Sequence, residues 1–122
     1  YQIFNIHILG TLKEPVCYPN MLQIVKKIEK IENKACVIVV DAALSKEENK
    51  GKIYVSKQKT ILGKSIGKQK IEIGDISIKA VVAKDFKLPI HNFQILQNIS
   101  LQFVMNMAEI VADSIFEVMK YT

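Results

Sequence analysis

Six consecutive apolar residues, Ala35 to Val40, precede a carboxylate at Asp41. An unbroken apolar run of this kind is typical of a strand that is buried on both faces, as in parallel sheets covered by helices. Ligands of such folds bind just outside the carboxyl ends of the strands. The pattern therefore predicts a buried strand over residues 35–42 and places Asp41 at a candidate site.

The residues before this strand show first a strand pattern and then a helix pattern. Residues 2–9 alternate loosely between apolar and polar side chains, which predicts a first strand. Residues 20–32 carry apolar side chains at helical spacing, and Asn20 with Gln23 fits a capping box at the start of this helix. A strand, a helix and a strand in this order predict two parallel strands joined by a right-handed crossover.

The second half of the chain contains further strand patterns and one long helix pattern. Residues 52–56 predict a strand near an edge of the sheet, residues 76–83 predict another, and residues 93–96 fit either a short strand or a helical turn. After Ser100 the apolar residues recur at helical spacing, and on a helix they would cover a wide sector of its surface. This predicts a long helix that is capped by Asn98 or Ser100 and buried over much of its circumference.

Length and composition indicate one globular domain. The chain has 122 residues, of which 49% are apolar, and we expect a single domain over residues 1–122. No stretch has the length of a membrane span and no secretory signal opens the chain, so a cytoplasmic location is expected. Cys17 and Cys36 are too few for a disulfide framework, and with His7 and His91 they lack the close spacing of zinc ligands. We therefore expect no metal and no other cofactor.

Lysine is the only basic residue type that contributes to the net charge of the chain. All 17 basic residues are lysines, the net charge is +5, and ten of these lysines lie within residues 50–87. Arginine is the residue that grips phosphate and base edges with two parallel hydrogen bonds, so its absence argues against a specific nucleic-acid reader. The lysine-rich window is either an ordinary solvated surface or a region that attracts an acidic protein partner.

A segment rich in glycine and lysine, residues 63–70, contains the sequence Gly-Lys-Ser. A phosphate-binding loop requires a glycine five residues before Gly63, where Gln58 stands, and no helix pattern follows. We interpret the segment as a surface loop that carries lysines, and we keep Gly63 and Lys68 as candidate pocket residues.

Four short blocks, taken together, resemble the YyaC-type sporulation protein family and occur in the order and spacing of that family. The blocks are Gly10–Val16, Val39–Ala42, Ile73–Ile78 and Leu96–Leu101. The resemblance implies a three-layer α/β/α domain with a mixed, mostly parallel central sheet. This peptidase/phosphorylase-like fold is similar to that of the spore germination protease and of the hydrogenase maturation endopeptidases.

The resemblance also implies a function for Asp41, which matches an acid of the active site in the endopeptidases. The partner acid of that site lies in a loop that this chain does not contain, so we expect the chain to be the C-terminal two-thirds of a larger family domain. The expected function is a role in sporulation or germination, in the cytoplasm of the mother cell or forespore, with acid-dependent cleavage of a protein or peptide. The alternative is a non-catalytic protein that binds a protein partner or a second copy of itself, without membrane or specific nucleic-acid contacts.

Three further polar residues have two interpretations each. Asn98 and Ser100 stand where the endopeptidases place a metal-binding histidine, so they either line a pocket or only cap the helix that follows. The lack of a histidine there argues against a nickel-dependent mechanism. Asp75 precedes a predicted strand, and we interpret it as a turn residue that bonds its own backbone rather than as a partner of Asp41.

Overall fold

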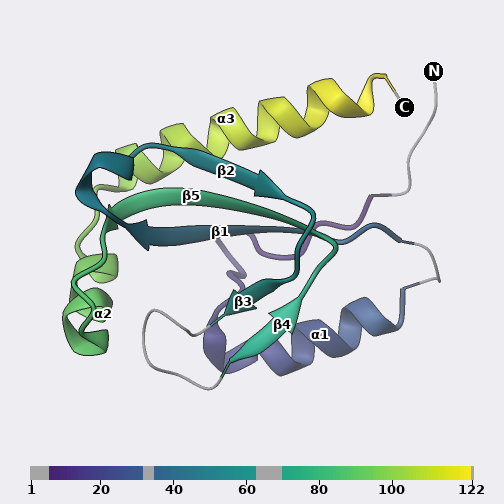
Figure 1. Ribbon diagram of the computed structural model, residues 1–122. Helices are drawn as coiled ribbons and strands as arrows, with labels where there is room; N and C mark the ends of the chain where they lie inside the picture. Colours follow the sequence, from purple (N-terminus) through teal and green to yellow (C-terminus); the bar gives the residue numbers. More distant parts are fainter. Residues whose placement is uncertain (1–5, 32–34, 63–69, 122) are drawn as a thin grey trace. The chain divides into compact units, whose positions relative to one another are not determined.

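The computed structural model describes residues 6–31, 35–62 and 70–121 (Figure 1). The chain divides into two compact units, Tyr1–Cys36 and Val37–Thr122. Each unit has its own set of internal contacts.

The first unit contains one α-helix, α1 (Met21–Glu29), which follows a 3-10 turn at Tyr18–Asn20. The helix confirms the prediction from apolar spacing but ends three residues earlier. The predicted capping box is wrong, because the Oδ1 of Asn20 accepts from the backbone N–H of Cys17 at 2.9 Å and makes no bond to α1. Of the predicted first strand, Ile6–Leu9 is not in a strand and the rest lies outside the described residues, so the crossover stays a prediction.

The second unit is built on a mixed sheet of three strands in the order β1-β5-β2. The strand β1 (Ile38–Ser45) pairs in parallel with β5 (Ile76–Lys84), and β2 (Ile53–Ser56) pairs with β5 in the antiparallel direction. The prediction of strands over these regions is confirmed, including β2 at an edge. The fold is therefore α/β, as expected, whereas a three-layer arrangement stays a prediction.

The buried strand of this sheet is β5, not β1. Six residues of β5 are buried, whereas β1 alternates between exposed and half-buried positions. Ile38 and Val40 are 41% and 50% exposed. The prediction that β1 is buried on both faces is wrong, because β5 has a neighbour on each side and β1 has one among the described residues.

A short hairpin of β3 (Thr60–Leu62) and β4 (Ile71–Ile73) follows β2 and leads back to β5. The pattern of the sequence predicts no strand in either place. Strands of three residues are too short to show a period in the sequence.

Two helices complete the second unit, α2 (Pro89–Gln97) and α3 (Leu101–Met119). Residues 93–96 thus belong to a helix. Figure 1 shows α3 lying along one face of the sheet, where Met107 packs in a core cluster with Ala80 and Val82 of β5. The prediction that α3 is buried over much of its circumference is wrong, since its buried residues are Met107 and Val111, whereas Phe116 is 60% exposed. None of the helices in the described ranges is long and apolar enough to cross a membrane.

Candidate functional site

Asp41 lies in the middle of β1 and not at its carboxyl end, because the strand continues for four residues to Ser45. In the register of the sheet, Asp41 stands beside Lys79 of β5, and Lys79 stands beside Tyr54 of β2. Paired residues of neighbouring strands project from the same face of a sheet. The carboxyl, the ammonium and the phenol therefore form one row across three strands.

This row belongs to the face of the sheet that α3 does not cover. The next row consists of Ala42, Ala80 and Ile53, and the last two pack in the core with α3. Because successive residues of a strand point to opposite faces, Asp41 projects away from that core. The candidate acid and α3 are thus on opposite faces of one sheet.

Burial changes the acidity of Asp41. Loss of hydration raises the pKa of this carboxyl, while a hydrogen bond from the backbone of Ala42 and the charge of Lys79 lower it by less. A carboxyl with a raised pKa holds its proton at a higher pH than an ordinary aspartate, which suits it to proton transfer. Among the described residues, the charged neighbour that shifts this pKa is Lys79.

Asp75 has a structural role at the entry to the same strand pair. Its Oδ2 accepts from the backbone N–H of Val37 at 2.8 Å, and its own N–H donates to the carbonyl of Val37 at the same distance. The carboxylate therefore bonds Val37, the residue just before β1, and the prediction that it bonds its own backbone is wrong. In the described parts of the chain, no group of three or more His, Cys, Asp or Glu side chains is placed to hold a metal ion.

Asn98 and Ser100 both cap helices and both line a hollow. The Oγ of Ser100 accepts from the N–H of Phe103 at 3.5 Å at the start of α3, and the Nδ2 of Asn98 donates to the carbonyl of Gln94 at 2.7 Å at the end of α2. The hollow measures about 450 Å³. It is lined by Lys50, Val82, Ala83, Ile95, Asn98, Ile99, Ser100 and Phe103. The two interpretations of Asn98 and Ser100 are therefore compatible.

A second hollow of about 360 Å³ shares Ile95 and Asn98 with the first. It is completed by Phe86, His91 and Gln94. The other two candidate pocket residues, Gly63 and Lys68, lie outside the described residues.

Two lysines pair with aromatic rings around these hollows, which the sequence does not predict. The Nζ of Lys50 lies 5.4 Å from the centroid of the Phe103 ring, and the Nζ of Lys84 lies 5.1 Å from that of Phe86. Lys50 and Phe103 are too far apart in the sequence for any local pattern to join them. Lys84 and Phe86 are neighbours, but only the structure shows that they lie beside a hollow.

Comparison with known proteins places this chain in a family. A family model described as "Protein of unknown function (DUF1256)" matches residues 1–114. The chain belongs to this family. It is also 31% identical over 114 residues to the uncharacterized protein YyaC of Bacillus subtilis (strain 168). The resemblance to a YyaC-type family is thus confirmed.

The matched region covers 93% of this chain and 54% of the Bacillus protein, so the chain spans about half the length of that relative. No solved structure matches the chain significantly. The family's description and the relative's name assign no activity.

Proposed function

We propose that the family protein acts in spore formation or germination, and that it is an acid-dependent endopeptidase on a three-layer, peptidase-like scaffold. The observation that carries the catalytic part is the half-buried Asp41, whose pKa is raised by burial on the sheet face opposite α3. Perturbed carboxyls of this kind gather at active sites. The sporulation role and the scaffold are supported by the resemblance to the YyaC-type family.

In the proposed reaction the Asp41 carboxylate takes a proton from water as that water attacks a peptide carbonyl. Lys79, beside Asp41 in the sheet, offsets the negative charge that develops on the oxygen of the attacked carbonyl. Departure of the amine requires a proton from a second acid. In this proposal that acid comes from the part of the longer family protein that this chain does not include.

The test uses the full-length family protein with small acid-soluble spore proteins as substrate. We expect discrete fragments from the wild type and cleavage at least about 100-fold slower with Asp41→Asn, the size expected when a general base is lost. Asp113→Asn, at an exposed position of α3, is the matched control and should cleave at the wild-type rate. Intact substrate with a folded wild-type protein, or equal cleavage by Asp41→Asn, would contradict the proposal.

A second function is favoured by a different observation. The charged neighbour of Asp41 is Lys79, and the two hollows lie by the junction of α2 and α3. These features support a protein that binds a peptide partner in the cytoplasm of the mother cell or forespore without cleaving it. Stable complexes with an unchanged partner would favour this function over the peptidase.

A further inference from the structure

The two hollows near the α2–α3 junction are neighbours that share a wall. Ile95 and Asn98 line both of them. Each has the volume of a site for a small group and not for a whole domain, since typical ligand sites measure about 300–1,000 Å³. Because they share a wall, two groups of one extended chain are able to occupy them side by side.

The walls are mainly apolar, and the polar groups among them are able to bond a peptide backbone. Ile99 and the ring of Phe103 belong to the first hollow. The Nδ2 of Asn98 donates to the carbonyl of Gln94, and the Oδ1 of Asn98 is able to accept from a peptide N–H. The hydroxyl of Ser100 is able to donate to a peptide carbonyl.

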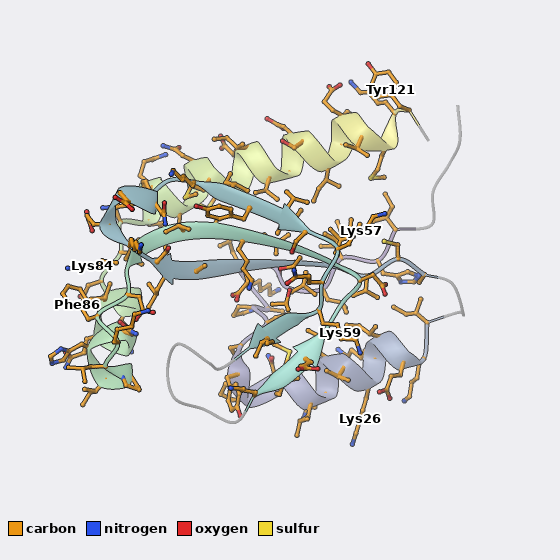
Figure 2. The ribbon with its side chains drawn as sticks, viewed as in Figure 1. Lys26, Lys57, Lys59, Lys84, Phe86 and Tyr121 are labelled. Carbon is orange, nitrogen blue, oxygen red and sulfur yellow. The ribbon has the colours of Figure 1, made fainter. Side chains whose placement is uncertain are left out.

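Lys50 is the charged side chain among the described residues that line the first hollow, and Lys84 lies over the ring of Phe86, which lines the second. Neither hollow has a carboxylate among the described residues that line it. The ion pairs within the described residues join Lys87 to Asp85 and Lys120 to Glu117, so Lys50 and Lys84 keep their charges available. Figure 2 shows Lys84, the last residue of β5, close to Phe86, which lies between β5 and α2. Asp85, which follows Lys84 in the chain, is bonded by Lys87 and by the Nδ2 of Asn92 at 2.9 Å.

We propose that this surface, the α2–α3 hollows, binds an acidic peptide segment in an extended conformation, with one apolar side chain in each hollow. Side chains two residues apart in an extended chain project from the same side, which matches two adjoining hollows. Carboxylates of the peptide pair with Lys50 and Lys84. The inference rests on the binding function proposed above and names its surface and the chemistry of its partner.

The site is independent of Asp41. Val82 and Phe103 place the first hollow on the α3 side of the sheet, whereas Asp41 projects from the other face. Loss of Asp41 should therefore leave peptide binding unchanged. Cleavage and binding thus have separate readouts, and either proposal can fail alone.

The test measures the fluorescence anisotropy of a labelled peptide, fluorescein-Asp-Asp-Leu-Glu-Leu-Asp-Asp-amide, titrated with the full chain. Two control peptides replace the acids by their amides or both leucines by serine. We expect the parent peptide to bind and each control to bind at least about tenfold more weakly, because one loses the ionic contacts and the other the apolar ones. Equal binding of all three peptides, or no binding of the parent at millimolar protein, would overturn the proposal.

Variants locate the site. The double variant Lys50→Met with Lys84→Met should weaken binding by about tenfold or more, through the loss of charge-assisted bonds. The matched control, Lys57→Met with Lys59→Met, removes the same charge from exposed positions between β2 and β3 and should change binding by less than about twofold. Asp41→Asn should bind like the wild type. Equal weakening by the two double variants would show attraction to the lysine surface as a whole and would overturn the proposed site.

Discussion

Two aspartates of one sheet show how the surroundings of a carboxyl decide its role. Asp41 stands within β1, where lost hydration raises its pKa. Asp75 stands just before β5, where its carboxylate accepts the backbone N–H of Val37. Burial makes the ionisation of Asp41 costly. The carboxylate of Asp75 instead links the start of β5 to the residue before β1.

The pH dependence of stability should report the environment of Asp41. Because its folded pKa is raised above the ordinary value near 3.8, the folded state keeps its proton at pH values where the unfolded state has lost it. Its contribution to stability is therefore complete below that value and is lost as pH rises through the folded pKa. A pKa that differs by one between the folded and unfolded states corresponds to about 1.4 kcal/mol of stability.

We expect Asp41→Asn to unfold at higher urea concentration than the wild type at pH 7 and to show little difference at about pH 3. The amide keeps the size of the side chain without the cost of a buried charge. Equilibrium unfolding at the two pH values measures this difference, with Asp113→Asn as the control. A variant that is less stable than the wild type at pH 7 would show that Lys79 outweighs burial.

At the scale of the elements, the long patterned segments could be predicted and the short ones could not. The strands β2 and β5 and the helices α1 and α3 follow from their apolar spacing, whereas β3 and β4, with three residues each, do not. Burial was harder to predict, because it depends on neighbours. The apolar run of β1 is as continuous as the run expected of a central strand. The strand with a partner on each side is nevertheless β5.

The candidate site was predicted in part, for a similar reason. Asn98 and Ser100 were singled out by their place before a helix, and both line a hollow. Lys50 and Phe103 meet only when the turn before β2 and the start of α3 are brought together by folding, so the sequence holds no local signal for them. A single sequence therefore does not reveal which distant residues tertiary contacts bring together in one site.

The turn into β5 depends on Gly74. Its φ is +99°, and a Cβ built there would lie 2.6 Å from the Cγ2 of Val39 in β1. Gly51 has a similar φ of +89° but nothing within 4 Å of such a Cβ. An alanine at Gly51 would therefore meet backbone strain alone, whereas an alanine at Gly74 would meet backbone strain and a steric clash.

We expect Gly51→Ala to lower the free energy of unfolding by about 1 kcal/mol, the cost of a left-handed residue with a side chain. Gly74→Ala should cost about 2–3 kcal/mol, because the clash pushes β1 away from β5 in addition. Urea unfolding at neutral pH measures both. Equal losses in the two variants would mean that Val39 moves aside at no cost.

At the scale of the whole molecule, the net charge of +5 comes from lysines without any arginine. Such a surface attracts every polyanion, so attraction alone does not identify a partner. Salt separates diffuse attraction from a built site, because each phosphate neutralised on duplex DNA adds about 0.9 to the slope of log affinity against log salt. A peptide held by two lysines and two apolar side chains has few ionic contacts to lose.

We therefore expect the affinity for an arbitrary DNA duplex to fall by about tenfold or more between 50 and 200 mM salt, and to be the same for unrelated duplex sequences. The affinity for the acidic leucine peptide should fall by much less, since burial of its leucines is insensitive to screening. Anisotropy titrations of both probes across this range give the two slopes. A steeper slope for the peptide than for DNA would mean that the α2–α3 hollows contribute charge alone, and that their apolar walls remain empty when the peptide binds.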